Sequence, residues 1–270
     1  DNVSEFDMLV SMATFGYNER DMTTEAKVID TPKVVYEAQG LFHPFLGRNA
    51  VRNDFSVSDR NFYIITGANM AGKSTFLRSL GINYVLAMNG MPVFANRLTL
   101  SRFNLFTSMR TTDDLTHGIS YFNAELLRLK QIIDAISPVK SVNNKPAQSR
   151  DEKMVSPETD SLPSGENRND VSKRRGATLI ILDEILKGTN SEDKLSGSRM
   201  FLEYVANRNV TGVIATHDLK LSAMTDEYPD RFHNFCFEIA LGTDVTYTYK
   251  ITPGVARNQN ATFLLNKLLH

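Results

Sequence analysis

Nine consecutive residues form the pattern in this sequence that most directly predicts chemistry. They satisfy G-x-x-x-x-G-K-[ST] and run Gly67, Ala68, Asn69, Met70, Ala71, Gly72, Lys73, Ser74, Thr75. Glycines let successive backbone N–H groups turn toward phosphate oxygens, the lysine reaches the β- and γ-phosphates, and the Ser74 hydroxyl ligates Mg²⁺. The pattern therefore predicts a phosphate-binding loop. An accidental Gly-Lys-Ser in a glycine-rich turn is the alternative, which the strand expected before the loop and the helix expected after it disfavour.

Two carboxylates follow a second apolar run. Residues 178–182 read TLIIL, and Asp183 and Glu184 come directly after them. A carboxylate at the end of a buried strand beside a phosphate loop suits Mg²⁺ binding, directly or through water, which we assign to Asp183. Glu184 is then placed to accept a proton from the water that attacks the γ-phosphate. A solvated Asp-Glu pair at a strand end is the alternative, which the wholly apolar strand disfavours.

A histidine ends the third apolar run. Residues 212–216 predict a strand, and His217 follows it. In a protein with a phosphate-binding loop, the third core strand ends beside the γ-phosphate. We therefore assign His217 a role in sensing the γ-phosphate, with a structural histidine as the alternative. The other four histidines have no spacing that indicates a metal site.

Hydrophobic periodicity predicts the elements that position these residues. Residues 62–66 form a β-branched run typical of a buried parallel strand. Apolar residues recur at helical spacing after residue 75 and over 121–136, where Phe122, Leu126, Leu129, Ile133 and Ile136 mark the expected buried face. A further helix is expected over 194–206, a strand-like run over 33–38, and a hairpin over 235–251 with its turn at 242–244. The order predicts an α/β fold: a mainly parallel sheet with flanking helices and a C-terminal β-hairpin.

The start of the chain and a segment in its middle differ from the phosphate-binding domain between and after them. Residues 5–13 place Phe6, Leu9, Val10 and Ala13 on one helical face, which we interpret as the end of a longer helix. We therefore assign residues 1–24 to the end of a preceding helical domain and 25–270 to the phosphate-binding domain. The chain begins at Asp1, so we interpret it as part of a longer protein. Residues 138–175 hold four prolines and many polar residues, which predicts a flexible insertion, with a regulatory segment as the alternative.

Composition excludes several classes of protein. Thirty Lys and Arg against 31 Asp and Glu give a net charge of −1, which argues against a strongly basic nucleic-acid-binding module. One cysteine, Cys236, rules out an intramolecular disulfide, and we expect it to be buried. No run of 18 apolar residues occurs, so we expect no membrane contact by this segment and a cytoplasmic location.

Four motifs together resemble the ATPase domain of MutS-type DNA mismatch repair proteins. They are TGANMAGKST at 66–75, LFTSMRTTDDLTHGISYFNAEL at 105–126, LDEILKGTNSED at 182–193 and ATHD at 215–218. Their order and spacing match along nearly the whole chain apart from 138–175. The resemblance implies a P-loop NTPase fold of the ABC type that binds and hydrolyses ATP with Mg²⁺.

The resemblance also implies residue roles. Residues 67–75 would bind the phosphates, Ser74 and Asp183 would hold Mg²⁺, Glu184 would activate water and His217 would sense the γ-phosphate. In the family two such domains form a dimer with composite sites, so we expect a homodimer in which Ser120 and Asn69 complete the neighbouring subunit's site. DNA would be contacted by domains of the parent protein outside this chain.

This sequence departs from the family pattern at several positions. Ala68 and Ala71 stand where the family has a proline and a glycine, and Ala71 adds a Cβ near the phosphates. Ala50 and Val51 stand where the family tends to place an aromatic shelf for adenine, and residues 258–260 replace a Ser-Tyr-Gly segment. These differences indicate a diverged MutS-like branch.

Two other functions fit the same motifs. One is an ABC-type engine of another machine, but the Leu-Ser-Gly at 195–197 follows the second strand, whereas the ABC signature precedes it. The other is a nucleotide-gated dimerisation module with little turnover. Measurement of turnover in the wild type and in Glu184→Gln separates hydrolysis from binding alone.

Overall fold

The fold is taken from a computed structural model that describes residues 2–109, 121–137, 176–187, 189–241 and 245–257. The expected insertion at 138–175, Ser120, the hairpin turn at 242–244 and residues 258–260 lie outside the described residues. Within the described ranges, no helix combines the length and the apolar character needed to cross a membrane.

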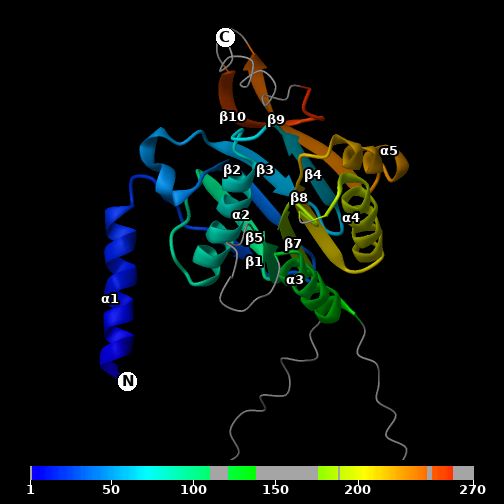
Figure 1. Ribbon diagram of the computed structural model, residues 1–270. Coiled ribbons are helices and arrows are strands. Elements are labelled where there is room, and N and C mark those ends of the chain that lie inside the picture. Colours follow the sequence, from blue (N-terminus) through cyan, green and yellow to red (C-terminus); the bar gives the residue numbers. More distant parts are fainter. Residues whose placement is uncertain (1, 110–120, 138–175, 188, 242–244, 258–270) are drawn as a thin grey trace, which may run out of the picture. The chain divides into compact units, whose positions relative to one another are not determined.

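A six-stranded sheet carries the residues singled out above (Figure 1). Its order is β10-β9-β4-β8-β7-β6, and every neighbouring pair is parallel except β9 and β10. The strands are β4 (Phe62–Gly67), β6 (Asn104–Ser108), β7 (Thr178–Asp183), β8 (Val210–Ala215), β9 (Phe232–Leu241) and β10 (Val245–Pro253). The mainly parallel sheet and the antiparallel hairpin are as the sequence predicts.

A second, four-stranded sheet was not predicted. It has the order β1-β5-β2-β3 and consists of β1 (Lys27–Ile29), β2 (Tyr36–Leu41), β3 (Asn53–Val57) and β5 (Arg97–Ser101). Strand β2 pairs antiparallel with both β3 and β5. The strand-like run expected at 33–38 is partly wrong, because the strand begins at Tyr36 and continues to Leu41.

Helices cover both faces of the six-stranded sheet. The structure contains α1 (Asn2–Asn18), α2 (Lys73–Met88), α3 (Tyr121–Ile136), α4 (Ser191–Ala206) and α5 (Met224–Glu227), with 3₁₀ segments at Pro44–Asn49 and Leu219–Ala223. Helix α4 begins three residues before the predicted start. The reason is a cap: the Asn190 side chain accepts a hydrogen bond from the Asp193 N–H at 2.9 Å.

The core forms two apolar clusters on opposite faces of the sheet. On β4, Tyr63 and Ile65 point into the cluster that α2 and the four-stranded sheet complete. Phe62 and Ile64 point into the other cluster, which α3, α4 and α5 complete. Because both faces are covered, the strand is apolar at consecutive positions, as its sequence predicts.

Four of the five residues predicted to form the buried face of α3 are buried or partly buried against the apolar cluster on that side of the sheet, and the fifth is not. Leu126, expected on that face, is 40% exposed, whereas Glu125 and Ile132 are buried beside Leu129. On this face the Glu125 carboxylate reaches backbone N–H groups of the segment after β7. A hydrogen-bonded carboxylate can thus replace an apolar side chain on a buried face.

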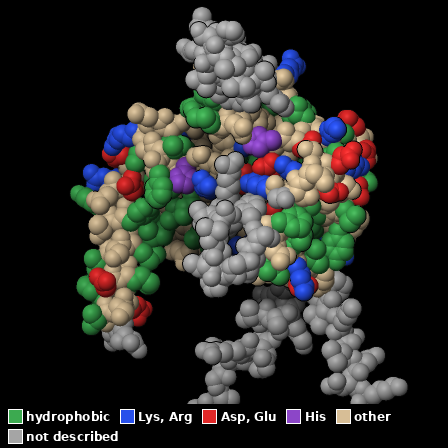
Figure 2. Space-filling model, viewed as in Figure 1, with side chains coloured by type: hydrophobic (Ala, Val, Ile, Leu, Met, Phe, Trp, Pro, Cys, Tyr) green, Lys and Arg blue, Asp and Glu red, His purple; other side chains and the backbone are tan. Residues whose placement is uncertain are grey.

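Helix α1 carries the apolar face expected from its sequence, but that face is exposed. Phe6 is 69% exposed and Leu9 is 53% exposed. Figure 2 shows hydrophobic side chains along this helix. An apolar stripe open to solvent fits the interpretation of α1 as the end of a longer helical region, which stays a prediction.

Candidate nucleotide-binding site

The carboxyl ends of three neighbouring parallel strands bring the predicted site residues to one edge of the sheet. Strand β8 lies between β4 and β7, with Ile65 and Asp183 both paired with Ala215. The segments that follow these strands therefore start side by side. They are the loop 67–75, the Asp183-Glu184 pair and the Thr216-His217 pair.

The loop after β4 has the backbone that its glycines predict. Gly72 has φ 108° and immediately precedes α2, where it leaves the first N–H groups of the helix without a side-chain cap. A Cβ at Gly67 would lie 2.9 Å from the Phe237 carbonyl oxygen, so glycine is required there for space as well as for its φ of 151°. Met70 at the loop tip also has a positive φ, of 64°, and is 75% exposed.

Lys73 lies at the centre of the loop and is 6% exposed. Its ammonium group donates to the carbonyl oxygens of Gly67 at 2.7 Å and Ala68 at 2.8 Å, and lies 3.3 Å from Nδ1 of His217. A buried cation held on two carbonyls beside an open loop is the arrangement that an anionic ligand can complete.

His217 connects the loop to the carboxylate pair. Burial, together with the positive charge of Lys73, lowers the pKa of His217, although the negative charge of Glu184 opposes this. The neutral imidazole is therefore favoured next to Lys73 at pH 7. Such a ring can accept or donate one hydrogen bond at each nitrogen and can respond to an added negative charge.

Glu184 is held between two lysines. Its Oε1 forms an ion pair and hydrogen bond with Lys194 of α4, and its Oε2 lies 3.8 Å from Nζ of Lys187. Burial raises the pKa of Glu184, but the hydrogen bond and charge of Lys194, with the charges of His217 and Lys187, outweigh burial and leave the pKa below its ordinary value. The carboxylate is therefore ionised at neutral pH, as a proton acceptor must be. The contact with Lys194 was not predicted.

Asp183 offers an oxygen suited to a cation. The residue is 6% exposed, and its Oδ2 is buried without a hydrogen-bond partner among the described residues. An unpaired carboxylate oxygen in a buried position is costly unless a cation or donor completes it. Asp183, with the half-buried Ser74 hydroxyl at the start of α2, therefore fits Mg²⁺, a cation that takes few protein ligands beside phosphate oxygens.

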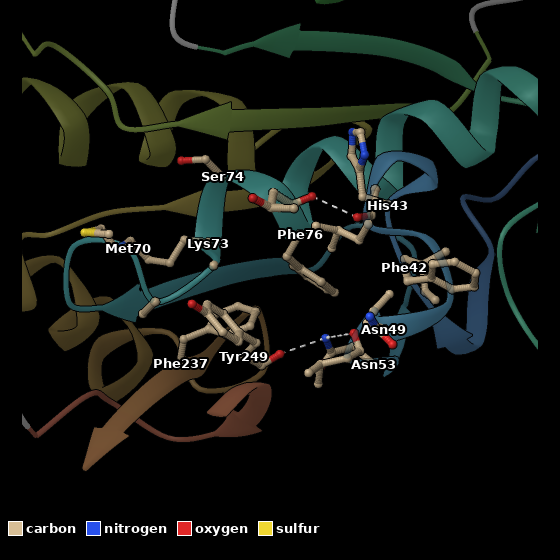
Figure 3. A pocket seen from close by; sticks show the side chains of 18 of the residues that line it. Phe42, His43, Asn49, Asn53, Met70, Lys73, Ser74, Phe76, Phe237 and Tyr249 are labelled. Atoms are coloured by element: carbon tan, nitrogen blue, oxygen red, sulfur yellow. Dashed lines mark hydrogen bonds between the residues drawn. The ribbon is translucent and has the colours of Figure 1, made fainter. Parts of the chain in front are cut away.

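A cavity of about 650 Å³ adjoins the loop (Figure 3). That volume lies within the range of small-molecule sites. Figure 3 shows Phe237 and Tyr249 at the end near Lys73, and Phe42 and His43 at the other end. Ala50 and Val51 also line the cavity, where the sequence analysis noted the missing aromatic shelf.

Tyr249 is a cavity residue that the sequence analysis missed. A register shift in β10 between Tyr247 and Ile251 gives Tyr249 a φ of 53° and brings its ring beside the loop, where a Cβ at Gly72 would lie 3.2 Å from Cδ1. Asn53 fixes this bulge, because its Nδ2 donates to the Tyr249 carbonyl at 3.0 Å and its Oδ1 accepts from the Ile251 N–H at 2.9 Å. The hairpin pattern alone contains no signal for the shift.

Glu125 was missed as well. Both of its carboxylate oxygens accept backbone hydrogen bonds, from Leu186 at 2.6 Å and from Lys187 at 3.0 Å. A signal for it is present in the sequence, because Glu125 follows Phe122 by three residues and precedes Leu129 by four, which places it on the apolar face.

The two alanine departures in the loop are accommodated within the core. Ala68 is 4% exposed and Ala71 is 1% exposed, and both belong to the apolar cluster on the α2 face of the sheet. Asn69, expected to act toward a neighbouring subunit, is exposed at the tip of the loop. The described structure thus brings Lys73, His217 and Glu184 together, while Ser120 lies outside it.

Comparison with known proteins agrees with the resemblance of the motifs. Residues 63–142 match the family model described as MutS domain V. A DNA mismatch repair protein MutS of Thermotoga maritima is 28% identical over 225 residues, which are 82% of this chain and 24% of that protein. MutS protein homolog 4 of Homo sapiens is 26% identical over 277 residues, which cover 96% of this chain and 24% of that protein. The chain therefore spans about a quarter of the length of the curated relatives it matches.

Proposed function

Because the chain is a MutS-like protein, we propose that it binds ATP with Mg²⁺ and hydrolyses it to ADP and phosphate. The observation that carries this proposal is that three neighbouring parallel strands bring the loop, His217 and the carboxylate pair to one edge of the sheet. Lys73 touches the loop carbonyls and His217, and Glu184 lies close enough to His217 for each charge to shift the pKa of the other. Phosphate binding and proton acceptance are thus available at one edge of the sheet.

Each residue has a role that its surroundings support. The backbone of residues 67–75 and the Lys73 ammonium would bind the phosphates. Ser74 and Asp183 would hold Mg²⁺, which supplies charge neutralisation on the phosphate oxygens when bound. Glu184 would accept the proton of the attacking water, and His217, next to Lys73, would sense the γ-phosphate.

The base of the nucleotide would lie in the 650 Å³ cavity. Tyr249 offers an aromatic face there and is 44% exposed, so it can stack on adenine without rearrangement of the core. In this assignment a ring from the C-terminal hairpin replaces the aromatic shelf that is absent at Ala50 and Val51.

We also propose that two chains complete each other's sites. Asn69 and Met70 are exposed at the tip of the loop, where a second subunit could reach them. Ser120 would act from the neighbouring subunit, as the motif resemblance implies. Curated relatives are described as DNA mismatch repair proteins, so we propose that the parent protein acts on DNA through domains outside this chain.

The test is ATP turnover by the wild-type chain and by Glu184→Gln. A general base contributes about 10²- to 10⁴-fold to a rate, so kcat is expected to fall by that factor while the Kd for Mg-ATP stays unchanged. Glu192→Gln is the matched control, because Glu192 is an exposed glutamate in the first turn of α4. Its kcat is expected to equal that of the wild type.

The solution mass of Glu184→Gln with and without Mg-ATP tests the composite sites. A shift from monomer to dimer on addition of Mg-ATP is the expected result, and a mass independent of nucleotide contradicts pairing by this chain. Turnover that survives in Glu184→Gln contradicts the assignment of the base. A wild-type chain that dimerises on Mg-ATP without turnover would instead be a nucleotide-gated dimerisation module.

A further inference from the structure

The segment that carries Glu184 is an unusual turn, defined here as the Glu184 turn, residues 184–187. Two of its residues adopt left-handed backbone conformations, Glu184 with φ 68° and Leu186 with φ 57°. Neither is glycine, so each costs free energy that surrounding contacts must offset. The conformation of this turn decides where the Glu184 carboxylate lies.

Contacts from α4 hold one side of the turn. Lys194 pairs with the Glu184 carboxylate, and the side chain of Leu186 packs over Gly197, where a Cβ would lie 2.4 Å from Leu186 Cδ1. These contacts fix two side chains of the turn. The backbone of the turn is bonded at its first two residues, because the Glu184 N–H donates to the Ala215 carbonyl at 2.9 Å and Ser198 Oγ of α4 donates to the Ile185 carbonyl at 3.5 Å. Neither bond holds the amides of Leu186 and Lys187.

Glu125 of α3 holds the backbone from the other side. It is 8% exposed, and its two oxygens accept from the consecutive N–H groups of Leu186 and Lys187 at 2.6 and 3.0 Å. Hydrogen bonds to an ionised acceptor are stronger than neutral ones. Two such bonds to consecutive amides fix the two peptide planes on either side of the Leu186 Cα, and with them the direction of the chain leaving Glu184.

The packing of α3 fixes the position of Glu125. One and two turns further along α3, Leu129 and Ile132 are buried in the same apolar cluster as Ile185 and Leu186. Glu125 therefore cannot move away from the turn without disturbing this packing. A buried carboxylate with this geometry has no role in phosphate or metal binding described above.

We propose that Glu125 is a positioning residue for ATP hydrolysis: it holds the Glu184 turn so that the Glu184 carboxylate stays aligned with the reaction centre. The inference rests on the proposed function, since it assumes that Glu184 is the base. Glu125 acts through the backbone of Leu186 and Lys187, and it does not touch the nucleotide. Its loss therefore lowers kcat and leaves ATP affinity in place.

Hydrogen exchange in the wild-type chain tests the contact directly. The amide protons of Leu186 and Lys187 are expected to exchange slowly, because both donate to a buried carboxylate. In Glu125→Gln one acceptor oxygen becomes an amide donor, so exchange in this peptide is expected to be about 10- to 100-fold faster. Unprotected amides in the wild type would overturn the proposal without any variant.

Turnover tests the consequence. Glu125→Gln is expected to lower kcat about 10- to 100-fold, the effect of a small misplacement of a catalytic group, with the Kd for Mg-ATP unchanged. Asp134→Asn is the matched control, because Asp134 is an exposed acidic residue on the same helix. Its kcat is expected to match that of the wild type.

A double variant separates positioning from a general loss of structure. If Glu125 acts through Glu184, then adding Glu125→Gln to Glu184→Gln costs no further turnover. Three results would each overturn the inference. They are an equal fall of kcat when Glu125→Gln is added to the wild type and to Glu184→Gln, a Kd for Mg-ATP that rises as kcat falls, and an unchanged kcat in Glu125→Gln. Absence of ATP turnover in the wild-type chain would instead contradict the proposed function. ATP turnover that persists in Glu184→Gln would contradict the assignment of Glu184 as the base.

Discussion

Asn53 joins two segments that lie far apart in the sequence, and its replacement gives the most informative single test of the cavity. The residue is 6% exposed, and its amide bonds both the Tyr249 carbonyl and the Ile251 N–H at the bulge of β10. The ladder between β9 and β10 shifts register there. Asn53→Ala therefore deprives two backbone groups of the partner that replaces the ladder.

The expected loss of stability follows from those two bonds. Leaving a buried polar group unpaired costs about 1–3 kcal/mol, and partial exposure of the bulge lets water recover some of it. Asn53→Ala is therefore expected to lower the free energy of unfolding by about 2–4 kcal/mol. In a chain of this size that corresponds to a fall in Tm of roughly 5–15 °C, measured by circular dichroism alongside a denaturant titration.

Nucleotide affinity supplies the second readout. Tyr249 loses the anchor of its backbone, and stacking on an aromatic ring is worth about 1–3 kcal/mol per base. The Kd for Mg-ATP in Asn53→Ala is therefore expected to rise about tenfold at a temperature where the variant is folded. Asn209→Ala is the control, because Asn209 is exposed and its Oδ1 accepts a surface hydrogen bond from Arg60 at 3.1 Å. A Tm for Asn53→Ala within about 2 °C of the control would contradict the contribution assigned to these two hydrogen bonds.

Three further predictions concern two glycines and the single cysteine. Gly212→Ala is expected to lower the free energy of unfolding by about 1–3 kcal/mol, because a Cβ there would lie 2.5 Å from Phe62 Cδ1 in the core. Gly81→Ala in α2 is expected to raise the free energy of unfolding by about 0.5–1 kcal/mol, because a Cβ there meets nothing within 4 Å. Denaturant titrations in which the two changes have the same sign would contradict this packing. Burial raises the pKa of the Cys236 thiol. Alkylation of this single cysteine at pH 8 is therefore expected to be slow in the folded chain and fast in denaturant. Equal rates under the two conditions would show that the thiol is accessible in the folded chain.

Local patterns predicted the part of the site that local sequence determines. The run at 62–66, the glycine-rich loop and the helix after it follow one another without a break, so residue spacing alone predicts strand, loop and helix. The same holds for β7 and Asp183, because a fully buried parallel strand is apolar at every position.

Long-range contacts explain what the sequence could not predict. The four-stranded sheet depends on pairs such as Tyr36 with Leu100, which neither strand's pattern specifies. Asn53 and Tyr249 meet across most of the chain. Glu125 bonds to backbone amides, which are the same for every residue type, so no pattern in residues 184–187 identifies its partner.

The central strand of the six-stranded sheet has a consequence for how this protein is made. Strand β4 is flanked by β8 and β9, with Phe62 opposite Gly212 and Phe232, so neither neighbour exists when β4 leaves the ribosome. At ordinary rates of synthesis the wait lasts roughly 10–30 s. An apolar strand without partners for that long is exposed to aggregation and to chaperones. The loop at 67–75 therefore cannot reach its final surroundings before β9 has been translated, because Gly67 at the start of the loop is paired with Phe237.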